Sequence, residues 1–207
     1  MMKENMKSFI EFIAEESKGS LNIFDIDDTL FHTTAQITVK KDGKVVQKLT
    51  NAEYNTYRLK TGESFDYSEF KDASKFYKES RPITRMINKA KSIINNMKNP
   101  LSRTIIITAR ANFDNRDKFL ATFRKYGFPI DKVYVERAGN MTDIDLPAEK
   151  KAVIISKYLK GGEYKKVRLF DDSMSNLRTF LRLKTQFPTV KFEAYYANPD
   201  GSVKTVR

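Results

Sequence analysis

The sequence contains no cysteine and only one histidine, His32, and both shortages restrict its chemistry. Without cysteine, the chain can form neither disulfide bonds nor thiolate metal sites. This composition fits a reducing compartment, and we expect a cytoplasmic protein. A metal site in this chain would have to be built from oxygen ligands.

Long apolar runs are missing as well. No stretch approaches the roughly 20 apolar residues that a membrane-spanning helix needs, so we expect no membrane partner. Residues 1–20 predict a short amphipathic helix, whose apolar face carries Met6, Phe9, Ile10 and Ile13. This segment lacks the unbroken apolar core of a signal peptide.

Acidic residues are fewer than basic ones. The 207 residues include 38 Lys and Arg against 26 Asp and Glu, which gives a formal net charge of +12. Such an excess of positive charge indicates an anionic partner. The chain length suits one domain with a sizeable insertion or two small lobes, and 40% hydrophobic residues suffice for a packed core.

Five apolar runs predict β-strands, and segments of helix length separate them. The runs lie at residues 21–25, 103–108, 132–136, 167–172 and 191–197. The segment 83–98 repeats apolar side chains at the spacing of one helix face. Strands that alternate with helices predict an α/β fold, with a mostly parallel sheet and helices on both faces.

Residues 31–81 interrupt this alternation. Their first part predicts a hairpin that turns at Asp42-Gly43, and the remainder is charged and aromatic without a clear period. We therefore interpret this segment as an insertion over the carboxyl edge of the sheet. Residues 1–30 and 82–207 would then form the core domain.

Acidic side chains follow two of the predicted strands. Asp25, Asp27 and Asp28 follow the first strand, and Asp171 and Asp172 end the fourth. Because ligands of parallel α/β folds bind outside the carboxyl ends of the strands, we expect these acids to converge. Clustered carboxylates repel one another unless a cation lies among them, and a site of oxygen ligands favours Mg²⁺.

The motifs at the predicted strand ends occur in a definite order. They are Asp25-x-Asp27-x-Thr29, Thr108 after an isoleucine run, a lysine at a helix start, and the pair Asp171-Asp172. In this order they resemble the haloacid dehalogenase (HAD) superfamily of phosphohydrolases, over most of residues 20–200. The resemblance implies a Rossmann-like sheet with a small cap insertion after the first strand, here residues 31–81.

The resemblance also implies a role for each motif. Asp25 would attack phosphorus as the nucleophile, and Asp27 would protonate the leaving oxygen and then activate water. Thr108 and the lysine would hold the remaining phosphoryl oxygens. The Mg²⁺ ligands would come from Asp25, the backbone carbonyl of Asp27, and the pair Asp171 and Asp172.

The substrate contacts and the identity of the lysine rest on weaker patterns. Thr29, Arg110 and Lys150 are candidate substrate-binding residues. Lys150 and Lys151 both precede suitably spaced apolar residues, and we favour Lys151 as the catalytic lysine. Asn176 either orients one of the acids or simply lies in the first turn of the last helix.

Basic and aromatic residues interleave through the insertion, a pattern typical of single-stranded nucleic-acid binding. Alternatively, the aromatic residues form a small core of the insertion and the lysines a solvated face. Residues 107–128 and 133–137 resemble, more loosely, the phosphatase half of bifunctional polynucleotide kinase/3′-phosphatases. The chain has no G-x-x-x-x-G-K-[ST] loop, so a kinase half is not expected.

We therefore expect a Mg²⁺-dependent phosphomonoesterase that acts on a nucleotide or on a terminal phosphate of a polynucleotide. The first alternative substrate is a sugar phosphate or another small metabolite phosphate. A non-catalytic phosphate-binding or nucleic-acid-binding module is a second alternative. A two-component receiver domain fits less well, because its acid pair precedes its phosphorylated aspartate in the chain.

Overall fold

A computed structural model describes residues 18–207 of the chain. The predicted amphipathic helix with Met6 to Ile13 lies outside these residues. Within the described part, no helix is long and apolar enough to cross a membrane.

The central element is a mixed six-stranded sheet with the strand order β11-β10-β9-β1-β7-β8. Its strands are β1 (Gly19–Phe24), β7 (Arg103–Thr108), β8 (Tyr134–Arg137), β9 (Tyr164–Asp171), β10 (Lys191–Ala197) and β11 (Val203–Val206). The strands β1, β7, β8, β9 and β10 run parallel to one another, whereas β11 pairs with β10 in the antiparallel direction. The predicted α/β fold with a mostly parallel sheet is therefore confirmed, and β11 is an addition that the sequence analysis did not predict.

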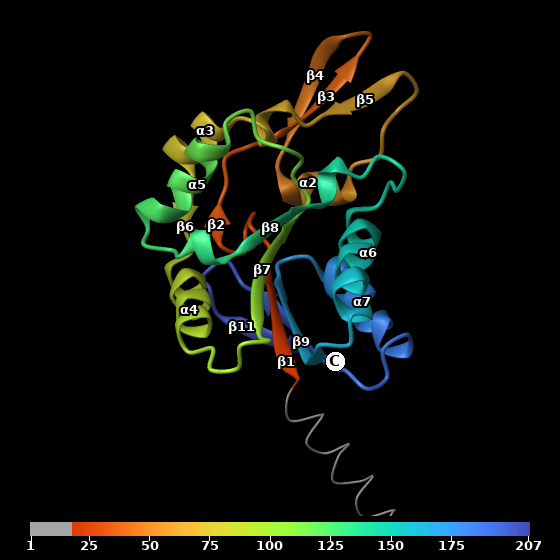
Figure 1. Ribbon diagram of the computed structural model, residues 1–207. Coiled ribbons are helices and arrows are strands. Elements are labelled where there is room, and N and C mark those ends of the chain that lie inside the picture. The colour runs from red at the N-terminus through yellow and green to blue at the C-terminus, as the bar shows by residue number, and fades with distance from the viewer. Residues whose placement is uncertain (1–17) are drawn as a thin grey trace, which may run out of the picture.

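Helices cover both faces of this sheet (Figure 1). The helices α4 (Thr84–Asn95) and α5 (Arg116–Lys125) lie on one side, and α6 (Pro147–Lys160) and α7 (Met174–Arg182) lie on the other. Three short 3₁₀ turns connect these elements, namely η2 (Ile130–Lys132), η3 (Ala138–Asn140) and η4 (Leu183–Thr185).

The alternation of side chains along β1 explains why the core has two halves. Leu21 and Ile23 belong to the apolar cluster that contains the buried residues of α6 and α7. Phe24 belongs to the cluster with α4 and α5, where its ring stacks on Phe170 at 4.6 Å. Successive strand residues point to opposite faces, so a strand covered on both sides is apolar at most of its positions.

The segment between β1 and α4 forms several small elements. They are β2 (Phe31–His32), β3 (Ile37–Lys41), β4 (Lys44–Leu49), α2 (Asn51–Thr56), β5 (Glu63–Asp66), η1 (Ser68–Phe70), α3 (Ala73–Glu79) and β6 (Arg81–Pro82). The strands β3, β4 and β5 form a separate sheet at the top of Figure 1, with the order β4-β3-β5. The strands β2 and β6 pair with each other where the segment leaves and rejoins the rest of the chain.

The predicted hairpin at Asp42-Gly43 is confirmed. It joins β3 to β4, and both turn residues have positive φ, 51° at Asp42 and 76° at Gly43. A two-residue hairpin turn of this kind needs two residues that tolerate the left-handed region, which explains why aspartate and glycine stand there.

The aromatic residues of the inserted segment pack mainly against protein. Tyr54, Tyr57 and Phe65 contact a small apolar cluster beneath the three-stranded sheet. Phe76 of α3 is buried in the main core, where its ring contacts Phe31. These contacts favour the interpretation that the aromatic residues form cores, and α3 packs with the main core rather than with the small sheet.

Candidate functional site

The carboxyl ends of β1 and β9 bring Asp25 next to the pair Asp171 and Asp172. Asp25 follows β1 directly, and its backbone N–H donates to the carbonyl of Phe170 at 3.1 Å, which continues the pairing of the two strands. Asp171 is the last residue of β9, and Asp172 follows it. Two segments far apart in sequence therefore deliver acids to one point of the sheet edge.

Asp25, Asp171 and Asp172 form the acid cluster of this protein. Each offers a carboxylate oxygen, and these oxygens lie within 4.8 Å of one another. Asp25 is 6% exposed and Asp171 is fully buried. The cluster could hold a metal ion, and its carboxylate oxygens are ligands that suit a hard divalent cation. The side chain of Asp27 points elsewhere, toward Arg110.

Lys151 is the cation of the acid cluster. Its Nζ donates to Asp25 Oδ1 and to Asp171 Oδ2, at 2.8 Å in both cases, and the residue is only 2% exposed. It lies in the second turn of α6, which begins at Pro147, a residue suited to the first turn of a helix. Lys150 points along a different face, because consecutive helix residues are about 100° apart, and it is half-buried.

Burial raises the pKa of the carboxyl groups in the acid cluster. The pKa of Asp25 rises to about 7, chiefly through desolvation, and Lys151 offsets only part of this effect while Asp171 adds to it. The pKa of Asp172 rises to about 8, again chiefly through desolvation, with further contributions from Asp171 and Asp25. Burial alone would lower the pKa of Lys151, but Asp171 and Asp25 outweigh it and raise that pKa above its usual value. Negative charge thus exceeds positive charge at this point, and a bound cation would relieve the excess.

Asp171 is held in a fixed orientation by α7. Asn176 donates from its side-chain nitrogen to both Asp171 oxygens, at 2.9 and 3.0 Å. The backbone N–H of Ser173, the N-cap residue of α7, donates to Asp171 Oδ1 at 2.9 Å. Of the two interpretations of Asn176, the structure confirms the one in which it orients an acid.

Thr29 and Asp28 lie in the turn that follows β1. The hydroxyl of the buried Thr29 lies 3.4 Å from Asp172 Oδ1 and can donate to it. Asp28 has a φ of 56°, its Oδ2 accepts from Asn51 at 2.9 Å, and its Oδ1 lies 3.7 Å from His32 Nδ1. The turn therefore links the acid cluster to the inserted segment.

Arg110 is buried beneath the inserted segment, where it pairs with Asp27. Its Nε donates to Asp27 Oδ2 at 2.9 Å and its Nη2 to Asp27 Oδ1 at 2.6 Å. Nη2 also donates to Thr33 Oγ1 at 2.9 Å, and Nη1 donates to the carbonyl of Phe70 at 2.9 Å. Three rings surround the guanidinium, those of Phe70, Phe76 and Phe113, with centroids 4.8, 4.9 and 5.3 Å away.

The guanidinium of Arg110 therefore forms its hydrogen bonds with protein groups. The bidentate pair with Asp27 is the strongest geometry available to an arginine and a carboxylate. From the sequence, Arg110 was expected to contact the substrate. The sequence carries no signal for its actual partners, because Phe70, Phe76 and Phe113 follow no spacing that links them to it.

Thr108 and Gly139 shape the loop that carries Arg110. The hydroxyl oxygen of the buried Thr108 accepts from the backbone N–H of Arg110 at 3.1 Å. A Cβ at Gly139 would lie 2.4 Å from the carbonyl oxygen of Ala109, so only glycine permits this close approach of η3. The end of β7 is therefore fixed on both sides.

Comparison with known proteins does not assign the chain to a family. No model of a protein family matches the chain, and no curated protein matches it in sequence.

Proposed function

We propose that this protein is a Mg²⁺-dependent phosphomonoesterase of the HAD type, with Asp25 as its nucleophile. The observation that carries the proposal is the acid cluster with Lys151, in which one lysine contacts two buried aspartates at 2.8 Å beside a third. This donor set lies at the carboxyl end of parallel strands, where ligands of α/β folds bind.

In the first step, a carboxylate oxygen of Asp25 attacks the phosphorus atom of the substrate. A P–O bond to Asp25 forms while the P–O bond to the leaving group breaks, which gives an acyl phosphate on Asp25. Lys151 orients this carboxylate and compensates part of the negative charge that gathers around it. Thr108 is the candidate for a hydroxyl contact to the phosphoryl oxygens.

Asp27 serves both steps as general acid and general base. It gives a proton to the leaving oxygen, and afterwards takes one from the water that attacks phosphorus and releases inorganic phosphate from Asp25. Arg110 holds the ionised Asp27 carboxylate through both of its oxygens, which is the form that takes the proton from water. To act as the acid, one Asp27 oxygen must first leave the guanidinium and take up the proton that it then gives to the leaving oxygen. We infer that Arg110 positions Asp27 for this work, rather than contacting the substrate itself.

Asp25, Asp171, Asp172 and the backbone carbonyl of Asp27 are the proposed Mg²⁺ ligands. The ion would supply positive charge that offsets the repulsion between Asp25 and the phosphoryl oxygens. The fit rests on the oxygen donors within 4.8 Å and on the raised pKa values of Asp25 and Asp172, because both describe a site with unbalanced negative charge. Asn176 keeps Asp171 in place for this role.

We further propose that the sheet and its helices form a Rossmann-like core and that residues 31–81 act as a cap. The cap interpretation is supported by the contact of Arg110 with the carbonyl of Phe70, which ties the inserted segment to the acid Asp27. The proposed substrate is a nucleotide or a terminal phosphate of a polynucleotide, supported by the formal net charge of +12.

The experiment is a phosphatase assay of the full chain on a substrate panel, with Mg²⁺ and with chelator. The panel contains phosphorylated oligonucleotides, mononucleotides, sugar phosphates and an aryl phosphate. We expect release of phosphate only with Mg²⁺ and with wild-type Asp25, with the best kcat/KM on nucleotide substrates. A preference for sugar phosphates would show that the substrate is a small metabolite rather than a nucleotide. If no member of the panel is turned over, a non-catalytic binding module would be the better interpretation.

A further inference from the structure

We propose that a hollow beside β2 and β6 binds the nucleotide next to the terminal phosphate of a polynucleotide substrate. The hollow has a volume of about 540 Å³ and is lined by residues 32–34, 78–81 and Tyr126. Its size lies within the range of about 300–1,000 Å³ that ligand pockets occupy. This proposal rests on the phosphatase function proposed above, in which the terminal phosphate of the substrate reacts with Asp25.

The hollow borders the acidic residues of the site. His32 on its wall pairs with Arg81 across β2 and β6, and His32 Nδ1 lies 3.7 Å from Asp28 Oδ1. Thr33, also on the wall, accepts a hydrogen bond from Arg110, the residue that holds Asp27. These contacts connect the wall of the hollow to Asp27 and Asp28, which follow Asp25 in the chain, and the proposal has the substrate follow the same direction from Asp25.

Ser80 is one of the residues that line the hollow, and its hydroxyl has no hydrogen-bond partner in the described part of the chain. Ser80 is 3% exposed, and its Oγ is buried and unpaired within residues 18–207. The backbone of Ser80 is satisfied, since its N–H donates to Phe76 and its carbonyl accepts from the Tyr126 hydroxyl at 3.3 Å. An unpaired buried hydroxyl is costly, so a rotation of the Ser80 side chain that brings its Oγ to a ligand in the hollow would gain a hydrogen bond.

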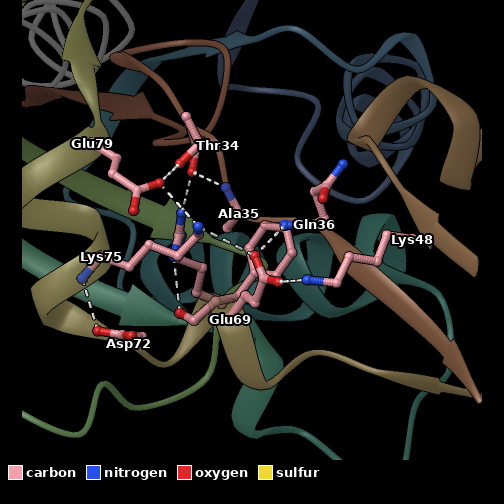
Figure 2. Close-up of polar contacts among 11 residues, drawn as sticks. Thr34, Ala35, Gln36, Lys48, Glu69, Asp72, Lys75 and Glu79 are labelled. Atoms are coloured by element: carbon pink, nitrogen blue, oxygen red, sulfur yellow. Dashed lines mark hydrogen bonds and ion pairs between the residues drawn. The ribbon is translucent and has the colours of Figure 1, made fainter. Parts of the chain in front are cut away.

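The basic residues that line the hollow favour an anionic ligand. Lys78 and Arg81 are exposed at the hollow, and neither forms an ion pair in the part of the chain that the structure describes. The acid on this wall, Glu79, is occupied, because its carboxylate accepts from the Thr34 hydroxyl and from Lys75 Nζ (Figure 2). Lys78 and Arg81 therefore remain available to bind the negative charge of a phosphodiester.

This arrangement favours a polynucleotide end over a substrate with a single phosphate. A ligand that occupies the acid cluster and the hollow together must carry a second anionic group outside the reacting phosphate. The phosphodiester next to a terminal phosphate supplies that group, and the Tyr126 side chain adds an aromatic wall for the attached nucleoside.

The test is equilibrium binding of a terminally phosphorylated, fluorescently labelled single-stranded oligonucleotide to the full chain, in chelator so that no turnover occurs. The variants Arg81→Gln and Lys78→Gln each remove one cation from the hollow. We expect each to raise Kd about tenfold, because a hydrogen bond to a charged group is lost, and to reduce the log–log salt slope by about 0.7.

The matched control is Lys44→Gln, which removes the same charge at an exposed position in the first residue of β4. We expect this control to change Kd less than twofold. If all three variants change Kd equally, or none does, the hollow is not the binding site. A bisphosphorylated sugar that displaces the oligonucleotide with similar affinity would also overturn the proposal.

Ser80→Ala provides an independent readout. Because the Ser80 hydroxyl has no partner in the free protein, its removal should leave Tm unchanged or raise it. Oligonucleotide binding should nevertheless weaken about threefold to tenfold. Unchanged binding, or a clear fall in Tm without oligonucleotide, would contradict the proposed role of this hydroxyl.

The outcomes separate this proposal from the proposed function. Turnover of an aryl phosphate by wild type but not by Asp25→Asn tests the reaction without using the hollow. If that turnover is present while the hollow variants match the Lys44 control, only the hollow proposal fails. If turnover is absent while binding depends on Arg81 and Lys78, only the phosphatase proposal fails.

Discussion

Lysine pairs with aspartate in two very different regions of this molecule. In the acid cluster, Lys151 contacts Asp25 and Asp171 at 2.8 Å, and all three side chains are at least nine-tenths buried. In the inserted segment, Lys40 contacts Asp66 at 2.6 Å, with side chains 36% and 26% exposed. The residue types and the N–O distances are similar in the two regions. The regions differ in how deeply the side chains are buried and in how many acids share each lysine.

The two regions shift the pKa of aspartate in opposite directions. Asp66 has its own lysine and a backbone N–H donor, and these lower its pKa to about 2. Asp25 shares one lysine with a second acid and is desolvated, which raises its pKa to about 7. A surface pair is balanced and worth little free energy, whereas the buried cluster is unbalanced in the way that binding and catalytic sites are. The comparison teaches that burial with an excess of negative charge, rather than an ion pair as such, distinguishes the candidate functional site from the surface pair.

The largest effect should come from Asp25→Asn. Because the amide cannot act as a nucleophile toward phosphorus, we expect kcat to fall by about 10⁴-fold or more on every substrate. The measurement is phosphate release under saturating substrate. The matched control is Asp66→Asn in the exposed pair, which should retain wild-type kcat; an equal loss in both variants would remove the contrast between the two regions.

Removal of the metal should rank second. Chelator should abolish phosphatase activity and added Mg²⁺ should restore it, because the proposed mechanism needs a cation at the acid cluster. Mg²⁺ should also raise the Tm of the wild type but not of Asp171→Ala, since a ligand that binds only the folded state stabilises it. Thermal unfolding with and without Mg²⁺ checks this without any substrate, and an equal rise of Tm in both proteins would argue against Asp171 as a ligand.

Substitution of Arg110 should act selectively on the leaving group. If Arg110 positions the acid Asp27, Arg110→Gln should lower kcat on an alkyl phosphate by about 10²-fold, because alkoxide departure needs a proton. An aryl phosphate, whose leaving group departs without that proton, should lose much less. The measurement is the ratio of kcat values on the two substrates.

The control for Arg110 is Asp27→Asn, which should show the same selectivity, and the double variant should lose little more than either single variant. Equal losses on both substrates in Arg110→Gln would instead indicate a purely structural role.

The smallest effect should come from the exposed pair Lys40–Asp66. A double-mutant cycle with Lys40→Gln and Asp66→Asn should give a coupling of about 0.2–1 kcal/mol. The pKa of Asp66 is lowered from 3.8 to about 2, so its contribution is present above pH 3.8 and is lost as the pH falls through about 2. Denaturant unfolding of wild type and Asp66→Asn over this range should show the two free energies of unfolding converging at the acidic end.

The sequence predicted the residues at the carboxyl edge of the sheet better than it predicted the elements and side chains that pack around them. Asp25 and Asp171 lie at the ends of strands and Lys151 lies near the start of a helix, and such positions can be read from apolar runs and their ends. The strand β11 escaped prediction because it has only four residues, and its two polar residues, Lys204 and Thr205, are both exposed.

The setting of Arg110 could not be predicted for a different reason. Its partners Thr33 and Phe70 depend on how the inserted segment folds back over the core, a tertiary arrangement without a local sequence signal. The same holds for Ser80, whose unpaired hydroxyl becomes visible only when the neighbouring elements are in place.

The most direct test of the central claim is mass spectrometry of the protein after rapid acid quench during turnover. The account predicts a phosphoryl group on the peptide that contains Asp25, labile to hydroxylamine as an acyl phosphate should be, and absent from Asp25→Asn. Steady turnover without such an adduct, in a preparation where Asp25→Asn remains active, would contradict the account.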